Sequence, residues 1–160
     1  MGGIQYIKLV NLIDINIYNY DTLNKIKSQY ISLLMYLTQT NDMTTEIFIE
    51  QIKKINSRGQ IIVAIRGDLA DDFVIVGSGT VIIEPKIIHG TSSVAHIEDI
   101  VTHPNFRGKS IATNIITRLK DYARHESCYK VILNCKDEYV KMYENSGFIK
   151  KGNEMSYYFN

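Results

Sequence analysis

The sequence has little cysteine, little proline and almost no net charge, and it lacks both tryptophan and any long apolar run. Its two cysteines, Cys128 and Cys135, are too few for a disulfide framework and lack the paired spacing of a zinc site. We therefore expect reduced thiols in a cytoplasmic protein. The net charge of +1 creates no overall field that would attract nucleic acid or an anionic membrane. The absence of a long apolar run argues against a signal peptide or membrane span.

No metal site and no second domain are expected either. The histidines lack ligand spacing and acidic companions; they are His89, His96, His103 and His125. The chain has no repeat, low-complexity tract or linker, and 160 residues suffice to bury a core without cross-links. We therefore predict a single domain over residues 1–160.

Apolar spacing predicts the secondary structure in chain order. The first half should hold a strand over Gln5–Leu12, a helix over Asp21–Leu37, and a second helix from Thr44 or Thr45, with Ile47, Phe48, Ile52 and Ile55 inward. Strands should follow over Ile61–Ile65, Phe73–Glu84 and Val94–Val101, then a helix over Lys109–His125. A buried strand over Lys130–Cys135, a short helix over Asp137–Ser146 and a strand over Met155–Phe159 should close the chain. This order indicates an α/β or α+β domain, a mixed sheet with helices on both faces.

The clearest local signal is the turn from Asn105 to Ala112, between a strand that ends at Pro104 and the following helix. Amide groups at a helix start have no intrahelical partner, and the helix dipole favours negative charge there. Gly108 allows close approach, and Arg107 and Lys109 supply positive charge. On this pattern alone two interpretations stay open: a phosphate site, or a capped helix start with exposed basic residues.

A wider pattern favours the first interpretation. The string Arg107-x-x-Ser110-x-Ala112 resembles the Arg/Gln-x-x-Gly-x-Gly/Ala motif of the GNAT acetyltransferase superfamily. The resemblance continues through His96–Val101, Cys128–Leu133 and Tyr143–Phe148. It narrows to the members that acetylate an amino sugar phosphate through Lys86–His89 and the ending Gly152-x-Glu154-Met155. It covers the chain from about Val81 onward, and before that only Leu37-Thr38 aligns.

The resemblance implies a mostly antiparallel mixed sheet and acetyl-CoA as cosubstrate, without a metal. It implies direct attack of the amine of glucosamine 6-phosphate on the thioester, in the route to UDP-N-acetylglucosamine. A bulge and a splay in the strand that holds Ile100 and Val101 would free backbone groups for the pantetheine arm. The cofactor-binding residues it implies are Ile100, Val101, Arg107, Gly108, Lys109, Ser110, Ile111, Ala112 and Tyr139.

The same resemblance assigns catalytic roles to Glu98, Tyr143 and Asn134. Glu98 would handle the proton of the amine, and the alternative is an exposed acidic strand end. Glu98 and Asp99 are neighbours in a strand, so they face opposite ways unless a bulge re-aims one of them. Tyr143 would donate to the leaving thiolate, since a phenol titrates near 10 and a thiol near 8.5; its alternative is a packing role. Asn134 would offer its backbone carbonyl beside the amine.

The substrate-binding residues implied by the resemblance are Thr38, Lys86, His89, Glu98, Asp99, Tyr129 and Lys130. In the family, Tyr129, Lys130 and the C-terminal strand reach the substrate of the neighbouring subunit. A homodimer with composite sites is therefore implied. Hydroxyl and cationic donors of this kind are suited to phosphate.

Four residues depart from the family pattern. Ser110 replaces the central glycine of the motif, and Asn134 replaces an aspartate, which leaves Glu98 as the nearby carboxylate base. Tyr139 replaces an asparagine that contacts CoA, and Tyr158 stands where the family has a basic residue. Two alternatives therefore stay open: acetylation of another amine, such as a different amino sugar, a polyamine or a peptide, and a CoA-binding module without catalysis.

Overall fold

The computed structural model describes residues 6–15, 19–68 and 72–159, so Gln5 lies outside the described residues. A five-stranded sheet forms the centre, in the order β1-β2-β3-β4-β5. The strands are β1 (Ile7–Asn11), β2 (Gly59–Gly67), β3 (Phe73–Glu84), β4 (Ser93–Thr102) and β5 (Cys128–Ile132). The first four pair antiparallel and β5 pairs parallel to β4. The predicted mixed, mostly antiparallel sheet is confirmed.

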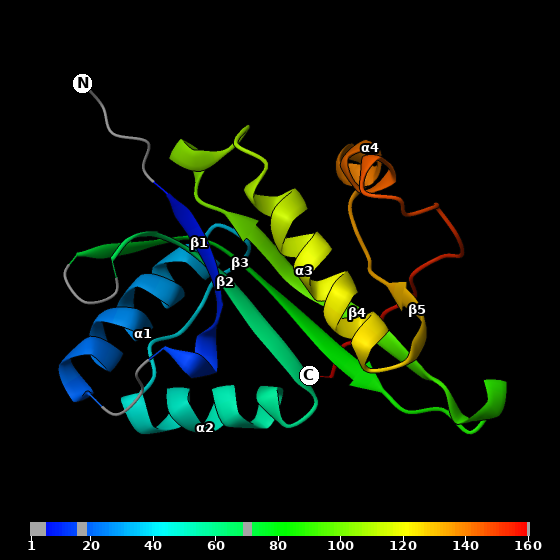
Figure 1. The fold of residues 1–160 in the computed structure, drawn as a ribbon, viewed down its shortest axis with the longest axis horizontal. Coiled ribbons are helices and arrows are strands. Elements are labelled where there is room, and N and C mark those ends of the chain that lie inside the picture. The colour runs from blue at the N-terminus through cyan, green and yellow to red at the C-terminus, as the bar shows by residue number, and fades with distance from the viewer. Residues whose placement is uncertain (1–5, 16–18, 69–71, 160) are drawn as a thin grey trace.

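Helices cover both faces of this sheet, as predicted (Figure 1). The first two, α1 (Tyr20–Leu34) and α2 (Thr45–Asn56), pack on one face, and α3 (Ile111–His125) packs on the other. Short 3₁₀ turns join the elements: η1 (Leu12–Asp14), η2 (His89–Thr91), η3 (Pro104–Phe106) and η4 (Asp137–Tyr139). The last helix, α4 (Val140–Asn145), follows β5.

Helix starts follow from local capping. The Asn19 side chain accepts hydrogen bonds from the amides of Asp21 and Thr22 at 3.0 and 3.2 Å, which begins α1. Thr44 caps α2 in the same way through the amide of Ile47. The prediction that Ile47 faces inward is wrong, because its side chain is 54% exposed. The buried stripe of α2 instead follows Thr45, Phe48 and Ile52, and Ile47 lies on the opposite side.

Several predicted boundaries shift by a few residues. The first helix ends at Leu34 rather than Leu37, where single turns replace the helical ladder. The helix predicted from Lys109 begins at Ile111, because Ser110 adopts a left-handed backbone conformation. The predicted buried strand Lys130–Cys135 is wrong in both bounds and burial, since β5 spans Cys128–Ile132. The observed β5 pairs with β4 alone, so three of its five side chains face solvent.

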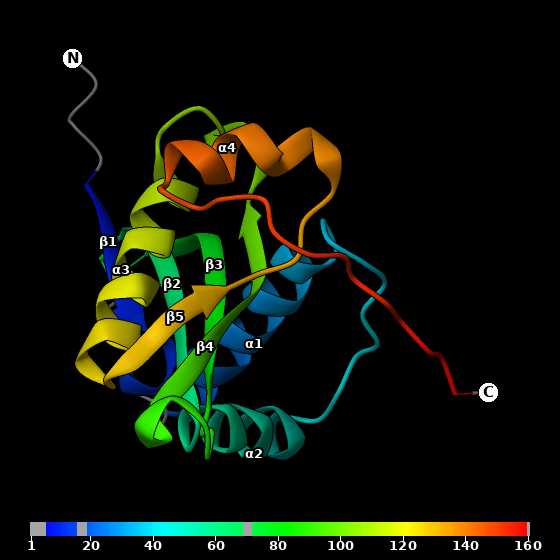
Figure 2. The same cartoon turned by 90° about the vertical axis from the view of Figure 1, so that its right-hand side faces the viewer.

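The predicted closing strand over Met155–Phe159 is absent from the described part of the chain. Met155, Tyr157, Tyr158 and Phe159 are 83–94% exposed. The apolar and aromatic composition is typical of a strand, but a strand also needs an edge to pair with. Figure 2 shows this tail, in red, running outward from the body of the molecule.

Candidate active site

The centre of the candidate site is a fork between β4 and β5. The two strands pair from Ser93 opposite Cys128 to His96 opposite Ile132. Beyond that point β4 continues to Thr102 while β5 has ended. Backbone amides and carbonyls on that side of β4 are therefore left without a β5 partner, a ready edge for a ligand rich in amides. The predicted splay is present.

A bulge interrupts β4 beside this fork. Ser78 of β3 pairs with Val101, and Thr80 pairs with Glu98. Only Gly79 therefore lies opposite the two residues between Glu98 and Val101. A bulge of this kind adds one residue to a strand and re-aims its side chains. The bulge needed to bring two adjacent carboxylates together is thus present.

The bulge changes where its two residues point. Asp99 takes a left-handed conformation with φ of 54°, and Ile100 packs with the α3 side of the core. A Cβ at Gly79 would collide with Ile100 Cδ1, so this close approach requires glycine. Burial is the main cause that raises the pKa of Glu98, and the nearby Asp99 charge raises it further. Burial also raises the pKa of Asp99.

The turn before α3 has the form of an anion cradle. Gly108 has φ of 74° and Ser110 has φ of 57°. The first backbone bond of α3 runs from the Asn114 amide to the Ser110 carbonyl at 2.9 Å, so the three preceding amides of the helix are free. The first turn of α3 contains no acidic residue, and Arg107 and Lys109 are exposed beside it. Amides in such a concave turn suit a phosphate.

Tyr143 of α4 is the predicted acid, and its ring packs edge-on against Phe148 at a centroid separation of 5.9 Å. Burial raises the pKa of Tyr143 to about 12, with smaller contributions from Cys135 and Tyr139. The phenol therefore stays protonated at neutral pH and is a hydrogen-bond donor. Asn134 lies exposed on the segment just after β5.

Three of the predicted phosphate-binding residues gather at the opposite end of β4. The His89 and Tyr129 rings lie 4.4 Å apart between centroids, and Lys130 Nζ lies 5.4 Å from the centre of the Tyr129 ring. Lys86 is engaged elsewhere, in an ion pair with Glu84.

Glu84 contacts two side chains, Lys86 and His96. Its Oε1 contacts Lys86, and its Oε2 lies 2.6 Å from His96 Nε2. The hydrogen bonds to Lys86 and then to His96 hold the pKa of Glu84 below its usual range. Lys86 therefore has an internal partner that a phosphate would have to displace.

Within a single chain, the predicted acceptor-binding residues fall into groups that lie apart. Lys130 lies opposite Val94 near the start of β4, whereas Glu98 lies four residues further along it. At about 3.3 Å per residue this is a separation of about 13 Å. Thr38 lies apart from them in the exposed segment after α1.

The structure adds polar residues for which the sequence gives no functional signal. Tyr30 is buried in α1 and accepts a hydrogen bond from Ser78 Oγ at 3.4 Å, and burial raises its pKa to about 12. Its helical spacing marks it only as a core residue. Tyr36 and His103 bond to each other across 67 positions of sequence. The one sequence feature that marks the His103 region is the His103-Pro104 pair at a strand end.

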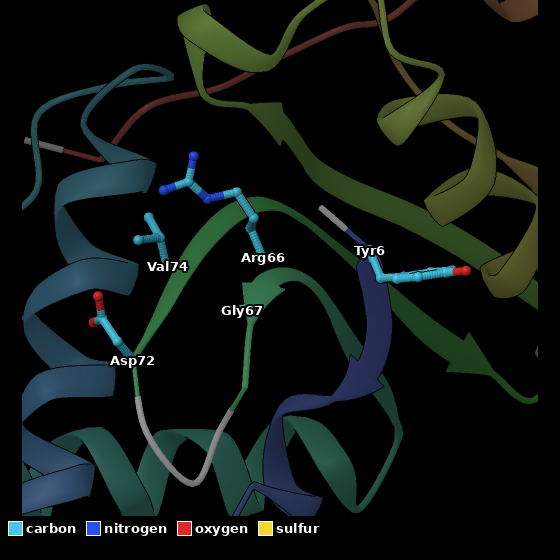
Figure 3. Close-up of a pocket in the computed structure, with 5 residues that line it drawn as sticks. All are labelled: Tyr6, Arg66, Gly67, Asp72 and Val74. Carbon is cyan, nitrogen blue, oxygen red and sulfur yellow. The ribbon is translucent and has the colours of Figure 1, made fainter. Parts of the chain in front are cut away.

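Two surface hollows lie away from these residues. One, of about 270 Å³, is lined by Tyr6, Arg66, Gly67, Asp72 and Val74. In Figure 3 Tyr6 lies just before β1, the other residues come from the β2–β3 hairpin, and the Tyr6 ring points away from Arg66. A second hollow of about 750 Å³ lies between the starts of α1 and α2. Neither is lined by a predicted site residue.

Within the part of the chain that the structure describes, no group of three or more His, Cys, Asp or Glu side chains gathers as metal ligands would. No helix in that part has the length and apolar character needed to cross a membrane.

Comparison with known proteins shows which family this chain is similar to in sequence. The sequence pattern of the acetyltransferase (GNAT) family matches residues 29–148. The chain is 39% identical over 132 residues to glucosamine 6-phosphate N-acetyltransferase 1 of Dictyostelium discoideum, covering 81% of this chain and 82% of that protein. It is 36% identical over 132 residues to the glucosamine 6-phosphate N-acetyltransferase of Arabidopsis thaliana, covering 81% and 87%.

The fold comparison agrees with the sequence. The crystal structure of glucosamine-6-phosphate N-acetyltransferase from Arabidopsis thaliana superposes with a TM-score of 0.83 at 32% identity, covering 98% of this chain and 100% of that one. The fork, the bulge and the amide-rich turn thus occur in a chain whose sequence and fold both match one family. The chain belongs to the acetyltransferase (GNAT) family and is similar in sequence and fold to its glucosamine 6-phosphate N-acetyltransferases.

Proposed function

We propose that this chain transfers the acetyl group of acetyl-CoA to the amine of glucosamine 6-phosphate, giving N-acetylglucosamine 6-phosphate and CoA. The observation that carries the proposal is the fork between β4 and β5, which opens beside the bulge at Glu98 and ends at the turn before α3. The names of the relatives point to the same reaction.

The donor binds along the fork. The pyrophosphate of CoA lies on the free amides from Arg107 to Ala112, and the pantetheine arm pairs with the backbone of Ile100 and Val101. Tyr139, exposed at the end of η4, contacts the cofactor from the α4 side. The cosubstrate is chosen by backbone amides and the helix dipole, since both recognise a diphosphate without a metal ion.

The acetyl group moves in one displacement. The amine forms the C–N bond as the C–S bond of the thioester breaks, and no acyl-enzyme forms. Glu98 accepts the amine proton, and its raised pKa brings its basicity closer to that of the group it serves. Tyr143, protonated at neutral pH, donates to the departing thiolate. The backbone carbonyl of Asn134 orients the amine.

The acceptor phosphate binds to His89, Tyr129 and Lys130, which stack together at the start of β5. We infer that this group serves the site of a second copy, because within one chain it lies about 13 Å along β4 from Glu98. The exposed tail over Met155–Phe159 would then find its pairing edge on the partner. The working form is a homodimer with composite sites, each chain one domain over residues 1–160, in the cytoplasm.

The test is release of free thiol from acetyl-CoA, measured first with glucosamine 6-phosphate and then with glucosamine. We expect turnover that depends on the phosphate. Absence of phosphate-dependent turnover would overturn the acceptor assignment.

A different amine is the second candidate, because Asn134 removes a charge beside the amine and Tyr158 removes a cation near the phosphate. A panel of amino sugars, polyamines and peptide amines decides between them, and preference for the sugar phosphate removes this candidate. Calorimetric binding of CoA with no turnover on any amine would instead favour a binding module.

A further inference from the structure

His103 caps the turn that leads to the candidate CoA site. Its Nδ1 accepts a hydrogen bond from the Asn105 amide at 3.2 Å, and Pro104 occupies the first position of η3 between them. The Arg107 amide then bonds the Pro104 carbonyl at 3.2 Å, which closes η3. The backbone that enters the anion cradle is thus set by the His103 side chain.

The other side of the same ring contacts the end of α1. Tyr36 Oη lies 3.3 Å from His103 Nε2, and the two rings meet edge-on with 5.2 Å between centroids. Tyr36 is itself held by a bond from its amide to the Leu33 carbonyl at 3.2 Å. It precedes Thr38, a predicted acceptor residue, by two positions.

These two bonds fix the tautomer of the ring. An amide N–H can only donate, so Nδ1 must carry the lone pair. The proton of neutral His103 therefore lies on Nε2, which donates to Tyr36 Oη. Both nitrogens are in use at the same time, one toward the donor turn and one toward the segment after α1.

A third contact fixes the plane of the ring. The Phe106 ring meets His103 edge-on at 5.7 Å between centroids. Arg66 and Lys109 lie over that Phe106 ring, at 5.3 and 5.1 Å from its centre. The Phe106 ring thus contacts both His103 and two cationic side chains.

We propose that His103 is a positioning residue that connects the two ends of the site. Its Nδ1 shapes the turn that binds the CoA pyrophosphate, and its Nε2 holds Tyr36 and, through it, the acceptor-binding segment around Thr38. The donor half of this inference depends only on CoA binding, whereas the acceptor half rests on the proposed function.

The test separates the two nitrogens with three variants, His103→Ala, His103→Asn and Tyr36→Phe. Calorimetry with CoA alone measures the donor half without any turnover. We expect His103→Ala to weaken CoA binding by about tenfold and His103→Asn to restore it to within about twofold, because an asparagine oxygen caps a turn as well.

Kinetics measure the acceptor half. Tyr36→Phe keeps the ring but loses the hydrogen bond, so we expect the KM for glucosamine 6-phosphate to rise about fivefold, with kcat and CoA affinity unchanged. His103→Asn should raise that KM by the same factor, since it also loses Tyr36. Tyr20→Phe and His125→Asn, two separate substitutions at exposed positions, serve as matched control variants. Melting curves establish that all variants fold.

The outcomes are distinct. Equal weakening of CoA binding in His103→Ala and His103→Asn would overturn the donor half. A rise in KM for both substrates in Tyr36→Phe would show a general structural role and overturn the acceptor half. If CoA binds but glucosamine 6-phosphate is not acetylated, the proposed function and the acceptor half fall together, while the alanine and asparagine variants still decide the donor half.

Discussion

The donor end and the acceptor end of this site differ in how much of each one chain builds. At the donor end, the open edge of β4, the bulge and the turn before α3 are assembled within a single fold. At the proposed acceptor end, Tyr129 and Lys130 lie on the exposed edge strand β5, and His89 packs on Tyr129 from η2, away from the bulge carboxylates.

The difference shows that backbone groups and side chains recognise their ligands in different ways. A diphosphate and an amide-rich arm are recognised by peptide groups, which the sheet and helix place correctly wherever they form. A sugar phosphate needs particular cations and hydroxyls, and in the dimer that we propose these come from surfaces of a second copy. The two ends should therefore respond to separate mutations.

The largest expected effect separates chemistry from donor binding. Tyr143→Phe should lower kcat by about 100-fold and leave CoA affinity within about twofold, because it removes a proton donor and no cofactor contact of comparable strength. Steady-state kinetics and calorimetry with CoA measure the two quantities. Tyr20→Phe, on the exposed start of α1, is the control. Loss of CoA binding in proportion to kcat would mean that the ends are not separable.

Lys130→Ala tests the acceptor end alone. Loss of a charge-assisted bond to phosphate should raise the KM for glucosamine 6-phosphate by about tenfold, with the KM for acetyl-CoA unchanged. Glucosamine without its phosphate should show no difference between variant and wild type. Lys54→Ala, on the surface of α2, controls for the loss of a lysine. An unchanged KM would remove Lys130 from the phosphate site.

Ser110→Gly tests the donor turn alone. Glycine removes the Cβ from the approach of the proposed phosphate, and it relieves a left-handed conformation that costs a non-glycine residue roughly 1–2 kcal/mol. The relief acts on the free and the bound protein alike and should raise stability, whereas loss of the Cβ should tighten CoA binding about threefold. Ser127 has the same φ of 57° at the far end of α3, so Ser127→Gly should stabilise the fold without changing CoA affinity. Equal effects on CoA would trace the gain to general stability.

The smallest expected effect concerns the stability that the protein loses by burying the Asp99 carboxylate in the bulge. Burial raises the pKa of Asp99 in the folded protein, so the folded state binds that proton more tightly than the unfolded state does. The resulting stability is present below the unfolded pKa and is lost as pH rises through the folded pKa. Asp99→Asn keeps a residue type that tolerates positive φ, and its Tm should exceed that of wild type by roughly 1–3 °C at pH 7.

The pH dependence checks this sign. Circular dichroism melts at pH 7 and at about pH 3 should show the gap closing at the lower value, where the wild-type carboxyl is protonated in both states. Asp121→Asn, exposed on α3, should show almost no gap at either pH. A gap that persists at low pH would locate the gain in packing rather than in charge.

Much of the fold could be predicted because its signals are local. The apolar stripes of α1 and α3, the β-branched runs of β2 and β3, and the Gly108 turn each follow from a few neighbouring residues. The family resemblance then predicted how the site is arranged, including the bulge at Glu98 and Asp99. Residue spacing alone predicted that these two side chains lie on opposite faces of the strand.

The rest depends on contacts that are distant in sequence. Whether Met155–Phe159 forms a strand depends on pairing with an edge, and in the described chain this segment stays exposed and pairs with none. The separation of Lys130 from Glu98 depends on where β5 pairs along β4. The bond between Tyr36 and His103 joins two loops that no local rule brings together.

The fork between β4 and β5 also bears on how such a protein can change over evolutionary time. An opening lined by peptide groups survives almost any side-chain replacement that keeps the two strands apart. A chain with this architecture is therefore free to drift at Ser110, Asn134, Tyr139 and Tyr158 and still hold the same donor. New acceptors would then arise from side-chain substitutions around the opening, without a change in the backbone that binds the donor.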